Sequence, residues 1–83
     1  MALYFLTYDV RADGDYQRLY DELAAFDAVR ILESTWCFNR TGTNPENLRD
    51  HFRTKVDTNT GLIVSEVSSW ASWGTDGNPN GLA

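Results

Sequence analysis

The sequence has few of the side chains that build metal and redox sites. Its 83 residues include one cysteine, one histidine and one methionine. The lone Cys37 cannot form an internal disulfide, and with one histidine it cannot supply the four ligands of a structural zinc site. No apolar run approaches the roughly 18 residues that cross a bilayer, so no membrane association is expected. Because there is no disulfide framework to maintain, the cytoplasm is the expected compartment.

Positive charge is also scarce. Seven Lys and Arg residues stand against twelve Asp and Glu residues, which gives a net charge of −5. This balance argues against a strongly basic nucleic-acid coat and against an electrostatic membrane anchor. It favours a protein partner with a basic surface. Lys55 is the one lysine, and the arginines that make up the remaining cations leave local contacts with anions open.

Apolar content is ample for a globular fold. Hydrophobic residues make up 42% of the chain and aromatic residues 13%, which argues against general disorder. The length leaves room for one domain. We assign residues 1–73 to this domain. Residues 74–83 are rich in Gly, Asn and Pro and are expected to form a flexible C-terminal tail.

Three segments have the composition of β-strands. Residues 2–10 are rich in Tyr, Phe, Leu and Val and contain no Gly or Pro. Residues 28–40 alternate apolar and polar side chains, and a bend at Ser34-Thr35 would divide them into two short strands. Residues 62–67 form the last clear strand.

Two segments between them have helical periodicity. Residues 16–26 carry one apolar stripe, formed by Tyr16, Leu19, Tyr20, Leu23 and Phe26. A second helix is expected to begin at Asn44-Pro45, because Pro suits the first helical position and Asn caps it. Its buried stripe is Leu48, Phe52 and Val56.

The resulting order, β-α-β-β-α-β, predicts an α+β ferredoxin-like sandwich: a four-stranded antiparallel sheet with two helices on one face. The first strand is apolar on both sides, so its second face should also be covered. Burial against a second copy explains this most simply, and we therefore expect a homodimer. Trp70 and Trp73 are candidates for the dimer interface, because Trp in so small a chain commonly packs. Base stacking is the alternative use of these rings.

Asp9 is the leading candidate for a catalytic or metal-binding residue. It ends an apolar strand, between Tyr8 and Val10. One interpretation is a turn-forming residue that binds nearby backbone N–H groups. The other is a metal ligand or general acid. One carboxylate binds Mg²⁺ poorly, but two copies of Asp9 across a two-fold axis would supply two, which suits metal-assisted phosphodiester cleavage.

Other polar groups have weaker patterns. Asp13-Gly14-Asp15 resembles part of a calcium loop but lacks the remaining ligands, so capping of the next helix by Asp13 or Asp15 is favoured. His51 and Cys37 would form a nucleophile and base only if the fold brought them together.

Four arginines are candidates for contacting phosphates: Arg11, Arg40, Arg49 and Arg53. Arg49 and Arg53 are four residues apart and therefore share a helix face. The alternative, which we favour, is a solvated face with ion pairs to Glu46, Asp50 or Asp57.

Two short motifs resemble a known family. Thr7-Tyr8-Asp9-Val10 is similar to the end of the opening strand of the small CRISPR-associated spacer-acquisition proteins, the second of the two core Cas proteins. Ser34-Thr35-Trp36 falls where that family has Ser, a β-branched residue and an aromatic residue on its second strand. Residues 2–67 follow the family's order of elements, so the resemblance covers most of the chain.

The resemblance implies a ferredoxin-like homodimer in which Asp9 is the candidate Mg²⁺ ligand and nuclease residue. It also implies antiviral defence as the setting. The same fold and dimer occur in related toxin–antitoxin proteins, including the virulence-associated protein D ribonucleases. In the CRISPR family the segment after the last helix-packed strand commonly adds to the partner's sheet, as residues 68–73 could here.

Two functions are therefore expected. The first is a metal-dependent endonuclease or endoribonuclease that acts on DNA or RNA through two copies of Asp9. The second is a non-catalytic dimeric adaptor that binds nucleic acid through arginine, or a basic protein partner through its acidic surface.

Overall fold

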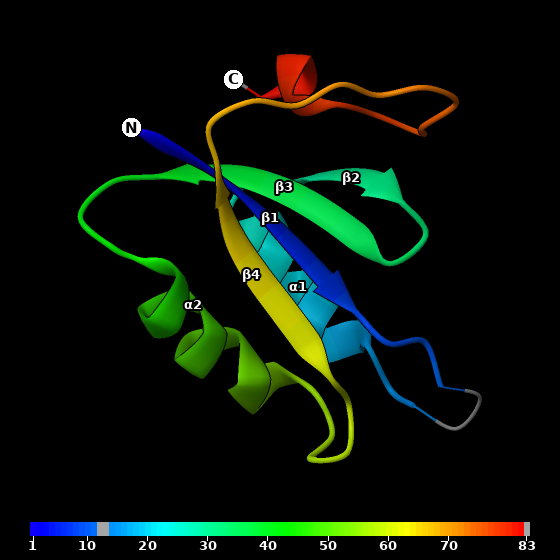
Figure 1. The fold of residues 1–83 in the computed structure, drawn as a ribbon. Coiled ribbons are helices and arrows are strands. Elements are labelled where there is room, and N and C mark those ends of the chain that lie inside the picture. Colours follow the sequence, from blue (N-terminus) through cyan, green and yellow to red (C-terminus); the bar gives the residue numbers. More distant parts are fainter. Residues whose placement is uncertain (12–13, 83) are drawn as a thin grey trace.

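The chain folds into one sheet with two helices on one of its faces (Figure 1). The computed structural model describes residues 1–11 and 14–82. The elements are β1 (Ala2–Tyr8), α1 (Gln17–Ala25), β2 (Val29–Leu32), β3 (Thr35–Arg40), α2 (Pro45–Phe52) and β4 (Leu62–Val67), with short 3-10 turns at Arg53–Lys55 and Pro79–Gly81. The strands lie in the order β2-β3-β1-β4, and each neighbouring pair is antiparallel. The predicted α+β class, with a four-stranded antiparallel sheet, is confirmed, and the arrangement is consistent with a ferredoxin-like sandwich.

The strand predictions are confirmed, with shifts at the ends. The first strand ends at Tyr8 instead of residue 10. The segment 28–40 divides into β2 and β3 at a tight turn, and the register shifts between Arg30 and Leu32. No helix in residues 1–11 and 14–82 is long and apolar enough to cross a membrane.

A side-chain cap marks the start of α2, and a bond one residue before the N-cap lies at the start of α1. Asn44 precedes Pro45, and its side-chain oxygen accepts a hydrogen bond from the Asn47 backbone N–H at 2.8 Å, as the sequence predicts. At the start of α1 the N-cap position is Tyr16, which makes no side-chain cap bond; Asp15, one residue earlier, accepts from the Gln17 N–H at 3.0 Å. The alternative cap, Asp13, lies outside the described residues, and so does part of the calcium-like Asp13-Gly14-Asp15 segment.

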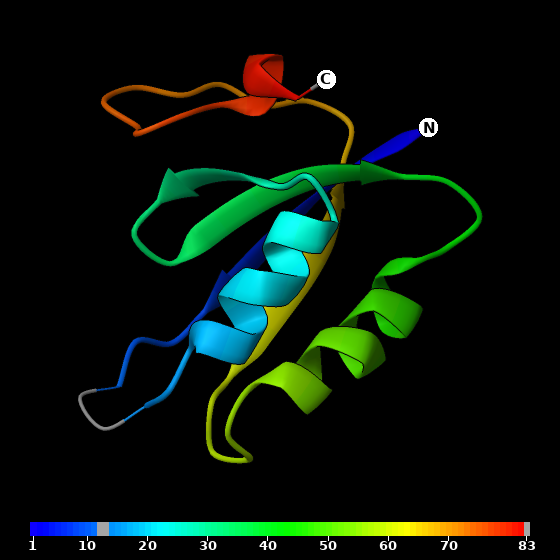
Figure 2. The same ribbon diagram turned by 180° about the vertical axis from the view of Figure 1, so that it is seen from behind.

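Both helices pack on the same face of the sheet, as Figure 2 shows from behind. Alternate residues of β1 point toward them, and the buried core combines strand and helix side chains: Tyr4, Leu6, Tyr8, Leu19, Leu23, Phe38, Leu48, Phe52 and Val56. Val56 follows the 3-10 turn and has an extended backbone. It is buried in the core, although it is not part of α2.

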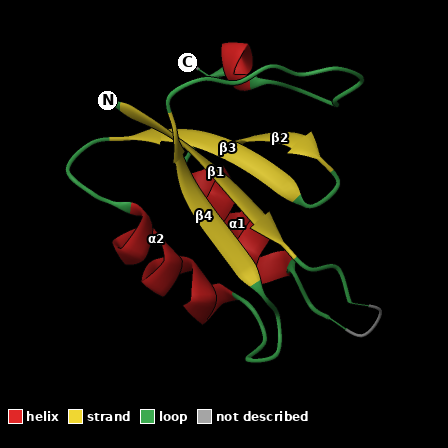
Figure 3. Ribbon diagram, in the orientation of Figure 1, coloured by secondary structure: helices red, strands yellow, loops and turns green. Residues whose placement is uncertain are grey.

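The opposite, outer face of the sheet is covered only in part. Residues 70–79 cross it, mostly as loop (Figure 3), and with Phe5, Ile31, Leu32 and Thr35 they enclose an apolar pocket of about 160 Å³. The Asp76 N–H donates to the Ile31 carbonyl oxygen at 3.0 Å. The cover ends there, because Ile63 on β4 is 66% exposed. The flexibility of residues 74–83 in solution stays a prediction.

The Tyr8 hydroxyl makes the stability of the fold depend on pH. Its hydroxyl lies 3.1 Å from the Tyr20 hydroxyl and 3.4 Å from the Glu33 carbonyl oxygen. Burial, followed by the hydrogen bond with Tyr20, raises the pKa of Tyr8 to about 12. The unfolded chain loses this proton near pH 10, so the stabilisation is complete below pH 10 and is lost as the pH rises through about 12.

We therefore expect Tyr8→Phe to be less stable than the wild type at pH 8, by about 1 kcal/mol for the lost hydroxyl contacts. The difference should shrink between pH 10 and pH 12, because only the wild type has this proton to lose. Urea unfolding followed by circular dichroism at each pH measures it. A difference that stays constant up to pH 12 would contradict the role given to Tyr8.

Candidate functional site

Asp9 lies just beyond β1, where the β1–β4 ladder ends. Its backbone N–H donates to the Gly61 carbonyl oxygen at 3.0 Å, which extends the pairing of Tyr8 with Leu62 by one residue. Its carbonyl oxygen accepts from the Tyr16 hydroxyl at 2.8 Å. These two bonds fix the backbone of Asp9, and its side chain stays 62% exposed.

The Asp9 carboxylate has one partner among the described residues. Arg11 Nη2 lies 3.0 Å from its Oδ2, and the Arg11 side chain is 45% exposed. The carboxylate accepts no backbone N–H in residues 1–11 and 14–82. The backbone N–H groups of residues 12 and 13, which a turn at Asp9 would also use, lie outside the described residues, so the turn-forming interpretation stays open. An ion pair this exposed contributes little to stability.

Gly61 gives the Asp9 carboxylate its room. A Cβ at position 61 would lie 2.9 Å from Asp9 Oδ2, closer than a normal contact. Asp9 Oδ2 is at the end of a flexible side chain. An alanine at position 61 would therefore displace the carboxylate and leave the backbone in place. Gly61 was not among the predicted site residues, because only the strand pairing brings it to Asp9.

A shallow hollow of about 280 Å³ adjoins the carboxylate. It is lined by Thr7, Tyr8, Asp9, Gly61, Leu62 and Ile63. Its lining combines the exposed apolar Ile63 with the acidic Asp9, whereas the Thr7 hydroxyl is bonded to the Thr35 hydroxyl on β3 at 3.1 Å. The hollow connects the candidate acid with the uncovered part of the outer sheet face.

Within residues 1–11 and 14–82, one copy of the chain shows no three-ligand metal site at Asp9. The part of the chain that the structure describes contains no group of three or more His, Cys, Asp or Glu side chains able to hold an ion. Asp9 offers one carboxylate, and Arg11 already engages it. The magnesium site predicted from the sequence takes its second carboxylate from a second copy, and it stays a prediction.

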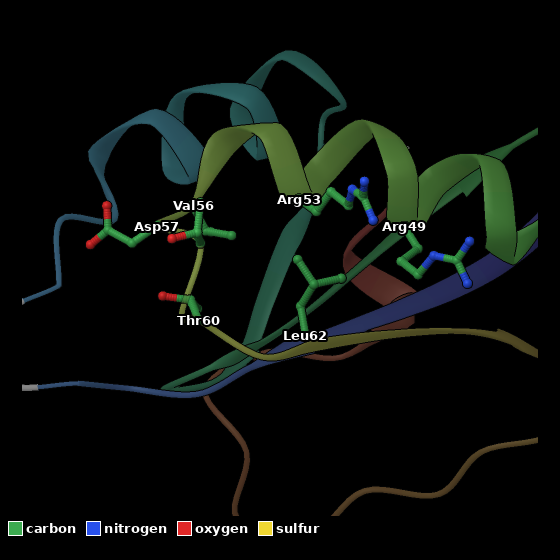
Figure 4. Close-up of a pocket in the computed structure, with 7 residues that line it drawn as sticks. Arg49, Arg53, Val56, Asp57, Thr60 and Leu62 are labelled. Carbon is green, nitrogen blue, oxygen red and sulfur yellow. The ribbon is translucent and has the colours of Figure 1, made fainter.

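The four candidate arginines do not converge on Asp9. Arg11 does lie beside it, but Arg40 pairs with Ala2 at the far end of the sheet, where its guanidinium lies 3.8 Å from the centre of the Phe26 ring. Arg49 and Arg53 line a separate hollow of about 350 Å³ between α2 and β4 (Figure 4). Arg49 also pairs with Asp50 at 3.1 Å, as the favoured alternative predicts.

The remaining candidates lie in other places. Trp70 is half-buried and lines the apolar pocket under the C-terminal segment, whereas Trp73 is 96% exposed. Their part in a dimer interface stays a prediction. Cys37 is fully buried in β3 on the row of Phe5, in the outer face, and burial raises the pKa of its thiol. His51 is on α2 and contacts Glu22, so the fold does not bring these two side chains together.

Sequence reasoning missed an aromatic cluster beside Asp9. Tyr8, Tyr16, Tyr20 and Trp36 form a chain of ring contacts with centroids 5.2 to 6.4 Å apart. The Arg30 guanidinium lies over Tyr20 and Trp36, at 5.2 and 5.4 Å from the ring centres. The i, i+4 spacing of Tyr16 and Tyr20 was the available signal. The two strand residues join them only through the fold.

No protein-family model matches the chain, and no solved structure matches it. The resemblance to the CRISPR-associated spacer-acquisition proteins therefore depends on the two quoted motifs and the order of elements, and it stays a prediction.

If Asp9 has no structural duty, replacing it should leave the fold intact. We expect Asp9→Asn and Arg11→Gln each to change the free energy of unfolding by at most about 1 kcal/mol. Leu6→Ala, in the core, should cost about 2 to 5 kcal/mol and provides the reference. Urea denaturation measures all three. A loss above about 2 kcal/mol for Asp9→Asn would show that the residue is structural.

Proposed function

We propose that two copies of this chain form a homodimer that cleaves phosphodiesters in RNA or DNA with the help of a divalent cation held by both Asp9 side chains. One observation carries the proposal. The exposed Asp9 carboxylate and the exposed apolar Ile63 line the same hollow at the end of β1. An interface that buries Ile63 therefore has Asp9 at its edge.

The uncovered half of the outer sheet face supports a dimer. Ile63 pairs with Thr7 and continues a face formed by Phe5, Ser65 and Val67. Ile63 is 66% exposed although it is a large apolar residue, and a second copy would cover it. A two-fold interface is self-complementary, so each copy contributes the same patch, and in the proposed dimer the axis passes beside the Asp9 hollow so that the two Asp9 side chains face each other.

The charge at this seam supports a cation. Two carboxylates close together repel each other, and a positive ion between them relieves the repulsion. The single carboxylate of one copy binds Mg²⁺ poorly, because the ion needs several oxygen ligands and otherwise keeps its waters. When bound, such an ion polarises a phosphate oxygen and activates water. The Arg11 beside each carboxylate could then contact the phosphate.

The dimer is tested through Ile63. Ile63→Glu places a charge in the proposed interface and should give a monomer, whereas the wild type should have about twice the monomer mass by light scattering at micromolar concentration. Ala24→Glu adds the same charge on the exposed side of α1 and should leave the dimer intact. A wild-type chain that is monomeric at every concentration would contradict the proposal.

The cation is tested through Asp9. Adding Mg²⁺ or Mn²⁺ should raise the melting temperature of the wild type and support cleavage of RNA or DNA that EDTA abolishes. Asp9→Asn should lose both effects and keep the dimer, because its side-chain shape is nearly unchanged. Without metal it should be as stable as the wild type or more so, since the repulsion is gone.

Gly61→Ala provides a second variant that leaves the carboxylate in the protein. Displacing Asp9 should weaken the metal effect and the cleavage together while the fold is kept. Cleavage that persists in both Asp9→Asn and Gly61→Ala would show that the reaction does not use Asp9.

A second function has its own support. The Asp9 carboxylate is already paired with Arg11, and the chain carries a net charge of −5. Both facts favour a non-catalytic adaptor that binds a basic protein partner. A dimer that shows neither metal-dependent stabilisation nor cleavage would identify the adaptor as the function.

A further inference from the structure

A groove runs between α2 and β4, away from Asp9. Two adjoining hollows of about 350 and 210 Å³ form it, and both are lined by Arg49 and Leu62. The first hollow is also lined by Arg53, Val56, Asp57, Thr58 and Thr60, and the second by Glu46. Arg49 and Arg53 project from the helix side while Leu62 and Val64 belong to the strand (Figure 4). We call this the α2–β4 groove.

Arg53 is available for an external partner. The other arginines each contact a group within the chain. The partners are Asp9 for Arg11, the Thr54 carbonyl oxygen for Arg18, the Glu33 carbonyl oxygen for Arg30, the Phe26 ring for Arg40 and Asp50 for Arg49. In the described residues 1–11 and 14–82, Arg53 has no hydrogen bond, ion pair or ring contact. Since the whole chain carries excess negative charge, an unengaged arginine over a hollow is well placed to attract an anion.

Arg49 adds further donors to those of Arg53. A guanidinium has five N–H groups. Arg49 directs Nε and Nη2 at Asp50 Oδ1, both at 3.1 Å, and keeps its remaining N–H groups. Planar guanidinium forks match the oxygens of phosphate, and a pair at i, i+4 can hold one phosphate between them. The apolar Val56 and Leu62 line the floor of this open hollow.

The acids at the ends of the groove limit what fits. Glu46 lines one end and Asp57 the other. Figure 4 shows the Asp57 carboxylate pointing away from both guanidiniums. A polyanion lying along the groove would meet both acids, whereas a single phosphate between the arginines would avoid them. A terminal phosphate carries up to two charges, and an internal phosphodiester carries one. Asp50 offsets the charge of Arg49, but a terminal phosphate offers three acceptor oxygens to the free N–H groups of both guanidiniums.

We propose that the α2–β4 groove binds one terminal phosphate group, from a mononucleotide or from the phosphorylated end of a strand, between Arg49 and Arg53. Asp9 is not among the residues that line this groove, so the site does not depend on the proposed nuclease function.

Calorimetric titration of the full chain tests the site. Adenosine 5′-monophosphate should bind and adenosine should not. Arg53→Gln should weaken binding about tenfold, the loss of one charge-assisted contact. Lys55→Gln removes the same charge from the same turn but does not line the groove, and it should change affinity less than twofold. Asp57→Asn should tighten binding, and Asp9→Asn should leave it unchanged.

Short oligonucleotides identify the source of the phosphate. An oligonucleotide with a 5′-phosphate should bind more tightly than the same strand with a 5′-hydroxyl. If the 5′-phosphorylated oligonucleotide binds more tightly than the mononucleotide, the ligand is the end of a strand. If it binds more weakly, the ligand is a free nucleotide. Equal binding of both strands, no binding of the monophosphate, or equal losses in Arg53→Gln and Lys55→Gln would each overturn the proposal. Circular dichroism of each variant confirms that it is folded.

Discussion

The structure depends on the position of β1 between β3 and β4. Both edges of this strand are hydrogen-bonded, so its side chains alternate strictly between two faces of the sheet. One set, Tyr4, Leu6 and Tyr8, enters the core under both helices. The other set, Leu3, Phe5 and Thr7, needs a different cover. The end of this strand also fixes where Asp9 emerges.

That second face has two different kinds of surface. The chain's own C-terminal segment packs against the β2 side, while the β4 side keeps Ile63 exposed. An interface on the exposed side would have Asp9 at its edge, and the α2–β4 groove opens on the helix side of β4. The two proposed sites share Leu62 and Ile63 of β4, but their charged residues differ, Asp9 in one and Arg49 and Arg53 in the other, so they can be tested separately.

The elements were predictable because their signals are local. The apolar stripes of α1 and α2, the Asn44-Pro45 start and the two-sided apolar β1 are each visible within one short segment. The position of the C-terminal segment was not, because the bond from Asp76 to Ile31 joins residues 45 apart in a stretch without periodicity. Asp9 was found from its place at a strand end. Its contact with Gly61 could not be predicted in the same way, and neither could the separation of Arg40 from Arg53, because both depend on how the strands pair in the sheet.

The one thiol of the protein lies in the face that the C-terminal segment crosses. Cys37 is fully buried, and burial keeps its thiol protonated. An alkylating reagent reacts with exposed thiolate, so modification of Cys37 has to wait until the covering layer opens. The chain therefore contains a built-in kinetic reporter: the labelling rate of one native side chain measures how often this layer lifts from the sheet, without an engineered probe.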